Sequence, residues 1–142
     1  QQYTPMPMRL ERMQRGKTEF ILDCYNANPA SMKNALEILG KETRSPRIAV
    51  LGDMKELGAS SKELHRQVAR WLLDNHIDYA FLAGKEMQSA ADALAGSPVH
   101  LSYGQDPHQW TAQLKDVLQQ CGGTCLLKAS RGMHFETLLK EI

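Results

Sequence analysis

Five short apolar runs recur along the chain at regular intervals. Each run is nearly continuous instead of alternating between apolar and polar positions. Such runs are typical of strands that are covered on both faces, as in a parallel sheet. We therefore predict strands at residues 18–23, 47–52, 79–84, 99–103 and 124–129.

Amphipathic stretches separate these runs, and each has the spacing of a helix with one buried face. Met32, Ala35, Leu36 and Leu39 follow the i, i+3, i+4, i+7 pattern. Further stripes predict helices that contain residues 64–72, 87–94, 110–118 and 135–142. N-terminal signals accompany some of these helices: Asn28 with Pro29, Ser60 with Glu63 as a capping box, and Asp106 with Pro107.

The alternation of strands and helices predicts a parallel sheet with helices on both faces. Before the first helix, residues 8–23 favour a hairpin that turns near Gly16, and residues 9–14 would then add an antiparallel strand at an edge. The expected fold is α/β, a Rossmann-like three-layer sandwich with about six mostly parallel strands. Residues 1–142 are enough for one domain and too few for two ordinary ones.

Composition narrows the class of protein. The content of 42% hydrophobic and 23% charged residues is that of a soluble globular protein. Lys plus Arg (17) nearly balance Asp plus Glu (16), which argues against nucleic-acid binding through bulk positive charge. The sequence has no run of about 20 apolar residues and no signal-like apolar block at its start, so we expect a cytoplasmic protein without membrane contact.

Cysteine usage fits the same compartment. The three cysteines, Cys24, Cys121 and Cys125, cannot all pair with one another, and the last two lack the spacing of a zinc knuckle. Because each lies in or beside a predicted strand, we expect buried free thiols in a reducing compartment.

Polar residues cluster in the loops that follow three of the strands, where ligands bind in such sheets. In the first loop, Asp23 ends a strand and is placed to accept hydrogen bonds from ribose hydroxyls, although a local turn or ion pair is the alternative. Asn26 suits a base edge, a ribose or a peptide, and equally an Asx-turn. Asn28 is expected to cap the next helix, with ligand contact also open.

The other two loops carry charges of both signs. Asp53 and Lys55 follow a strand directly and offer opposite charges to an ionic or zwitterionic ligand, or they belong to an ordinary surface loop. Lys128, Ser130 and Arg131 lie between the last strand and the last helix. This set predicts a carboxylate or phosphate site, with a solvated basic turn as the alternative.

A complete catalytic apparatus is absent from the sequence. Gly16-Lys17-Thr18 resembles the end of a phosphate loop, but the required earlier glycine is replaced by Glu11. The sequence also lacks a GxGxxG motif, a GxSxG elbow and histidine spacings that bind metals. His65 is expected on the flank of a helix, in ordinary packing.

Four blocks of the sequence match one family in its order. These are "RLE", "DCYNANPASMKNAL", "LGDMKELGASSKELH" and "LLKASRGMHFE", within residues 8–136. Together they resemble the C-terminal domain of Mur ligases. The second and third are most similar to the member that adds D-alanyl-D-alanine to UDP-N-acetylmuramoyl-tripeptide in peptidoglycan synthesis.

The resemblance implies a three-domain, ATP-dependent peptide ligase of which this chain is the last domain. ATP would phosphorylate the tripeptide carboxylate, the amine of D-alanyl-D-alanine would attack the acyl phosphate, and phosphate would leave. The phosphate loop and the Mg²⁺ ligands would lie mainly in the central domain, outside this chain. The chain also begins without Met. We therefore expect a piece of a longer protein that is inactive alone.

The resemblance also implies roles on the nucleotide side. Arg9 matches the arginine that reaches the ATP phosphates, and Asp23 matches the aspartate on the ribose hydroxyls. Asn26 and Asn28 belong to the signature near the nucleotide. Cys24 departs from the common pattern, in which serine or alanine is frequent.

On the substrate side, the resemblance assigns the dipeptide carboxylate to Lys128, Ser130 and Arg131, with help from Asp53 or Lys55. Ala129 stands where the family usually has glycine, which weakens the expectation of a close backbone approach at that turn.

Two alternatives remain at this point. One is a related ligase that adds glutamate, of the Mur or folylpolyglutamate type. The other is a free-standing Rossmann-like regulatory module. About 300 upstream residues with a GxxxxGK[ST] motif would favour a ligase, and a start codon near Gln1 would favour the module.

Overall fold

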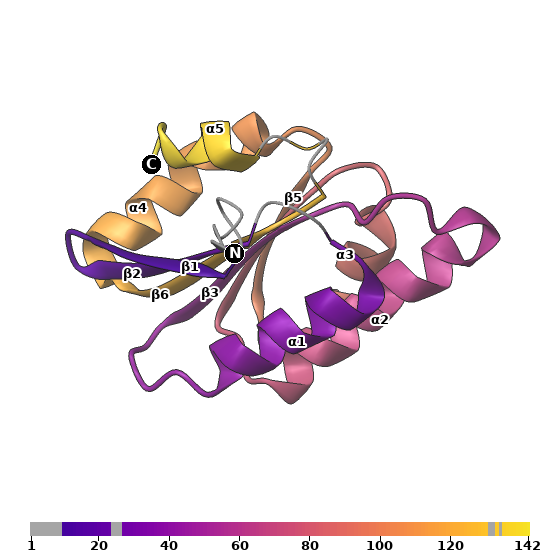
Figure 1. Cartoon of the computed structure of the whole chain (residues 1–142), viewed down its shortest axis with the longest axis horizontal. Coiled ribbons are helices and arrows are strands. Elements are labelled where there is room, and N and C mark those ends of the chain that lie inside the picture. Colours follow the sequence, from indigo (N-terminus) through magenta and orange to yellow (C-terminus); the bar gives the residue numbers. More distant parts are fainter. Residues whose placement is uncertain (1–9, 24–26, 131–132, 134) are drawn as a thin grey trace, which may run out of the picture.

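The computed structural model describes residues 10–23, 27–130, 133 and 135–142, apart from the side chain of Glu136. A six-stranded sheet with the order β1-β2-β6-β3-β4-β5 forms the middle layer (Figure 1). Its strands are β1 (Glu11–Arg15), β2 (Thr18–Asp23), β3 (Arg47–Gly52), β4 (Tyr79–Ala83), β5 (His100–Gly104) and β6 (Gly123–Lys128). The pair β1–β2 is antiparallel and the other pairs are parallel, which confirms the predicted fold class.

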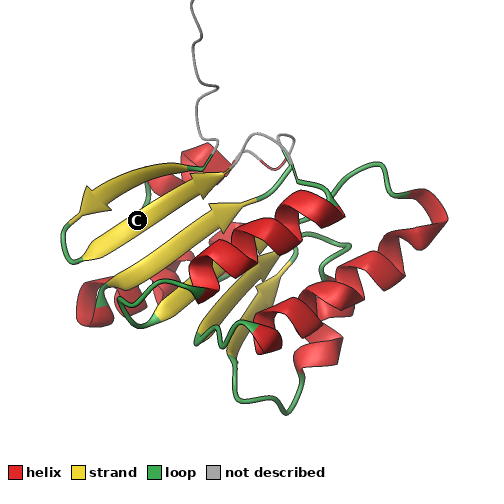
Figure 2. Ribbon diagram, turned by 60° about the horizontal axis from the view of Figure 1, so that its bottom comes forward, coloured by secondary structure: helices red, strands yellow, loops and turns green. Residues whose placement is uncertain are grey.

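Helices cover both faces of this sheet (Figures 1 and 2). One face packs against α1 (Pro29–Gly40), α2 (Ser61–Asp74) and α3 (Gln88–Leu94). The opposite face packs against α4 (Thr111–Cys121) and α5 (Phe135–Leu139). Each face has its own apolar cluster because the strands are apolar on both sides.

The central position of β6 determines which loops become neighbours. Although β6 comes last in the chain, it lies between β2 and β3. Asp23 at the end of β2 is in register with Lys128 of β6, and Leu51 of β3 is in register with the same lysine. The carboxyl ends of these three strands therefore lie together.

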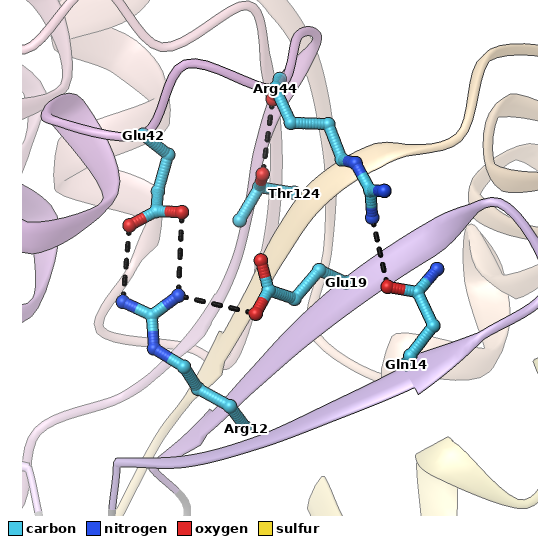
Figure 3. A network of polar contacts seen from close by, with 6 residues as sticks. All are labelled: Arg12, Gln14, Glu19, Glu42, Arg44 and Thr124. Atoms are coloured by element: carbon cyan, nitrogen blue, oxygen red, sulfur yellow. Dashed lines mark hydrogen bonds and ion pairs between the residues drawn. The ribbon is translucent and has the colours of Figure 1, made fainter.

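The antiparallel edge strand is held by charged and polar side chains (Figure 3). Arg12 donates two hydrogen bonds to Glu42, at 3.0 and 3.3 Å, and another to Glu19 at 3.4 Å. Arg44 donates to Gln14 at 2.9 Å. These exposed charges also make β1 a poor template for pairing with another chain.

Two of the helix starts differ from the sequence expectation. Ser60 does precede α2, but its side chain caps no backbone N–H, so the predicted Ser60–Glu63 capping box is wrong. A 3-10 helix at Gly58–Ser60 gives Ser60 helical backbone angles, and a capping side chain needs an extended backbone. Asp106 does form a cap, but of a 3-10 helix at Pro107–Gln109, and α4 begins only at Thr111.

The cysteine expectation is confirmed at one position and wrong at another. Cys125 is a buried thiol in β6, whereas the thiol of Cys121 is exposed. Cys121 is the last residue of α4 and does not belong to the strand. Cys24 lies outside the described residues. Within the described part of the chain, no helix has both the length and the apolar character needed to cross a bilayer.

Candidate functional site

The loops at the carboxyl end of the sheet diverge around β6. The loop after β6 leads to α5 on one face, whereas the loops after β2 and β3 lead to α1 and α2 on the other face (Figure 1). Open α/β sheets bind ligands where neighbouring loops separate in this way. Five of the polar residues singled out in the sequence, Asp23, Asp53, Lys55, Lys128 and Ser130, lie at this end of the sheet.

A buried ion pair joins two of them. Lys128 Nζ lies 2.6 Å from Asp23 Oδ2, and the lysine side chain is fully buried while that of Asp23 is 9% exposed. The sequence reasoning assigned Asp23 to ribose and Lys128 to a dipeptide carboxylate. Because the two groups contact each other, they belong to one part of the site, and the ion pair that was the alternative for Asp23 is present.

Asn28 performs the cap that its sequence context predicts. Its Oδ1 accepts from the Ser31 backbone N–H at 2.9 Å, and the Ser31 hydroxyl receives the Asn28 N–H at 3.1 Å. The backbone of Asn28 is extended and Pro29 occupies the first turn, as a helix start requires. The side-chain oxygen is thus already used within the chain.

Asp53 ties the loop after β3 to the loop after β4. Its two carboxylate oxygens accept the backbone N–H groups of Glu86 and Met87, at 3.1 and 2.9 Å. Burial raises the pKa of Asp53 above its usual value, while these two hydrogen bonds act in the opposite direction. The carboxylate packs so closely on Gly84 that a Cβ there would overlap it.

Lys55 follows Asp53 by two residues and is exposed. It contributes to the wall of a pocket of about 400 Å³. The pocket is lined by residues 53–58, Ser61, Lys85 and Glu86, so charges of both signs surround it.

The sequence reasoning missed a polar network around His65. It placed His65 on a helix flank, but the residue is fully buried on the same face of α2 as Val68 and Leu72. His65 Nε2 lies 3.0 Å from the Met54 backbone nitrogen, and Nδ1 lies 2.8 Å from the Ser61 carbonyl oxygen. The i, i+4 spacing of Ser61 and His65 in "SKELH" was the available signal.

Ser130 connects the loop after β6 to the loop after β3. Its N–H lies 3.3 Å from the Asp53 carbonyl oxygen. Its hydroxyl oxygen is buried and has no hydrogen-bond partner among the described residues. A buried hydroxyl without a partner is costly, so it marks a place where a ligand or water would be favourable.

Close packing brings these two loops together. A Cβ at Gly52 would lie 2.7 Å from the Ala129 Cβ and 3.0 Å from the Phe135 ring. Glycine at position 52 therefore permits the approach, and alanine at position 129 is accommodated by it. Arg9, Asn26 and Arg131, which the sequence also singled out, lie outside the described residues. Among the described residues, no group of three or more His, Cys, Asp or Glu side chains could hold a metal ion.

The sequence model of the family described as "Mur ligase, glutamate ligase domain" matches residues 8–131. The chain belongs to this Mur ligase family. The match includes the loops that carry Asp23, Asp53 and Lys128, so the described site lies within the family domain.

Curated relatives of this Mur ligase domain extend well beyond it. The chain is 33% identical over 143 residues to the UDP-N-acetylmuramoyl-tripeptide–D-alanyl-D-alanine ligase of Bacillus subtilis, and the match covers 95% of the chain. It is 32% identical to the enzyme of the same name from Escherichia coli, with 96% of the chain covered. The chain spans about 30% of the length of each of these relatives.

Solved structures of the same type share the fold. MurF from Acinetobacter baumannii superposes with a TM-score of 0.86 at 29% identity, covering 99% of this Mur ligase domain and 30% of that chain. MurF ligase from Thermotoga maritima, solved in complex with ADP, superposes with a TM-score of 0.80 at 26% identity, covering 98% of the domain and 31% of that chain.

Proposed function

We propose that this chain is the C-terminal domain of an ATP-dependent ligase that joins D-alanyl-D-alanine to UDP-N-acetylmuramoyl-tripeptide. The observation that carries the proposal is the identity of 33% to the Bacillus subtilis ligase along 95% of the chain. The similarly named Escherichia coli enzyme adds support from a second organism.

On the nucleotide side, Asp23 receives the ribose hydroxyls and Lys128 holds its carboxylate. The pair supports this because Lys128 Nζ lies 2.6 Å from Asp23 Oδ2 and so holds the carboxylate in place. Oδ1 is then suited to accept from a ribose hydroxyl. Arg9 and Asn26 complete the proposed nucleotide contacts, and Asn28 contributes by starting α1.

On the substrate side, Ser130 and Arg131 receive the dipeptide carboxylate, with Lys55 in support. The Ser130 hydroxyl has no hydrogen-bond partner among the described residues, which supports its part in this role. Asp53 acts by joining the loops, since both of its oxygens already accept backbone N–H groups. We assign Lys128 to the nucleotide side of the site, because its ammonium group donates a hydrogen bond to Asp23.

In the proposed reaction, the tripeptide carboxylate attacks the terminal phosphorus of ATP and ADP leaves. The dipeptide amine then attacks the acyl phosphate, loses its proton and releases phosphate as the amide bond forms. Residues in another part of the longer protein would hold Mg²⁺. The domains proposed to hold the UDP-sugar and the phosphate loop precede this one.

Phosphate release by the full-length gene product tests the function. We expect release only when ATP, UDP-N-acetylmuramoyl-tripeptide and D-alanyl-D-alanine are all present, and none from the 142-residue chain alone. Release that requires glutamate in place of the dipeptide would establish the alternative ligase. Turnover by the isolated chain would contradict the proposal that the phosphate loop lies in another domain.

A ribose analogue tests the role of Asp23. In the full-length enzyme, Asp23→Asn should raise the KM for ATP and leave the KM for 2′,3′-dideoxy-ATP nearly unchanged, because the analogue has no hydroxyls to lose. The comparison between nucleotides does not depend on how much of the variant is folded. An equal effect on both nucleotides would exclude a ribose contact.

A further inference from the structure

The buried histidine of α2 belongs to a closed ring of polar contacts at the carboxyl end of β3 and β4. His65 contacts the Met54 backbone, and Met54 follows Asp53 in the chain. Asp53 accepts the Glu86 N–H, and the Glu86 carboxylate accepts the Ser61 hydroxyl at 2.6 Å. Ser61 lies one helical turn before His65, which closes the ring.

The contacts of His65 determine its protonation state. A carbonyl oxygen only accepts, so the contact with the Ser61 carbonyl requires a proton on Nδ1. A backbone N–H only donates, so the contact with Met54 requires Nε2 to be unprotonated. Both contacts are satisfied together by the neutral Nδ1–H tautomer.

This tautomer fixes the backbone of the loop after β3 at Met54. Residues 53–57 lie between the end of β3 and a 3-10 helix. Glu56 in this loop has a φ of 61°, a left-handed conformation that non-glycine residues rarely adopt. His65 anchors the loop from inside the protein, immediately before Lys55.

We propose that His65 is a positioning residue for binding of the dipeptide. It acts through the Met54 backbone to hold Lys55 at the wall of the pocket formed by residues 53–58, Ser61, Lys85 and Glu86. The proposal rests on the proposed function, in which Lys55 supports the dipeptide carboxylate. The ligand contact belongs to Lys55, and the histidine sets where that contact is made.

Two substitutions separate the two contacts of His65 in the full-length enzyme. His65→Gln keeps an acceptor near the position of Nε2, whereas His65→Asn keeps a donor near Nδ1 and is too short to reach Met54. We expect His65→Asn to raise the KM for the dipeptide about five- to tenfold, the ratio that corresponds to one lost hydrogen bond. The KM for ATP should change by less than about twofold, and His65→Gln should restore most of the dipeptide affinity.

Coupling to Lys55 distinguishes positioning from a general loss of structure. If His65 acts through Lys55, His65→Asn should have almost no further effect on the dipeptide KM in a Lys55→Met background. An equal effect in both backgrounds, or a parallel rise in both KM values, would overturn the proposal. Lys115→Met, which removes an exposed lysine on α4, serves as the matched control and should leave both KM values unchanged.

The tautomer can be examined without any substitution. Long-range ¹H–¹⁵N correlation on the wild-type protein should show His65 Nδ1 protonated and Nε2 unprotonated. The opposite tautomer would overturn the proposal, because Nε2 could then not accept from Met54. Dipeptide-dependent phosphate release by the wild-type enzyme tests the proposed function separately, so its failure can be told apart from a failure of this inference.

Discussion

The buried pair of Lys128 and Asp23 makes a strong prediction about stability. Replacing Lys128 by methionine keeps most of the side-chain volume but leaves the Asp23 carboxylate without its partner in a nearly water-free place. Asp23→Leu removes the carboxylate that lies 2.6 Å from the fully buried Lys128 ammonium group. We expect both single variants to be strongly destabilised.

The magnitude follows from the geometry. At the separation of 2.6 Å and an effective dielectric constant of about 20, the attraction is about 6 kcal/mol. Removing the two ions from water costs several kcal/mol for each, so the intact pair contributes little net stability. A single substitution removes the attraction but leaves the other ion buried, with its cost of transfer from water. It should therefore lower the free energy of unfolding by about 3–5 kcal/mol.

Urea unfolding of the 142-residue chain measures the effect, with the double variant Asp23→Leu/Lys128→Met as the decisive comparison. Because the double variant removes both charges of the pair, its free energy of unfolding should recover to within about 1.5 kcal/mol of the wild type. Lys115→Met, at an exposed position, should change stability by less than about 0.5 kcal/mol. Single variants that lose less than about 1 kcal/mol, or a double variant as unstable as their sum, would refute the reasoning.

Three smaller perturbations test other parts of the structure. Asn28→Ala removes the cap of α1 and should cost about 1 kcal/mol in urea unfolding, while Asn28→Ser should retain most of it; equal losses would argue against the cap. Gly84→Ala places a Cβ against the buried carboxylate at a φ of 113°, so thermal unfolding should report a loss of at least about 2 kcal/mol, and a neutral result would contradict the packing. The carboxylates of Glu141 and Asp106 raise the pKa of His108 in the folded protein. The stability that protonated His108 contributes is therefore fully present below its unfolded pKa of about 6.5, and it is lost as the pH rises through the folded pKa. Unfolding of the wild type and of His108→Gln between pH 5 and 9 should therefore differ only on the acidic side, and less so in high salt, whereas a difference independent of pH would exclude this linkage.

The sequence alone determined the layered α/β fold. Strands β2 and β3 occupy the predicted residues because strands buried on both faces must be apolar throughout. The cap at Asn28 was predictable for a related reason, since all its partners lie within one helical turn. Local contacts of this kind can be predicted from short stretches of sequence.

Only the tertiary structure decided how the site is assembled. Lys128 and Asp23 are 105 positions apart, and they meet because the last strand inserts between β2 and β3. Glu86 likewise joins Ser61 and His65 only when α2 packs beside the loop after β4. Apolar periodicity specifies that a strand is buried but not which strands are its neighbours, so the loops that share the site depend on the order of strands in the folded sheet.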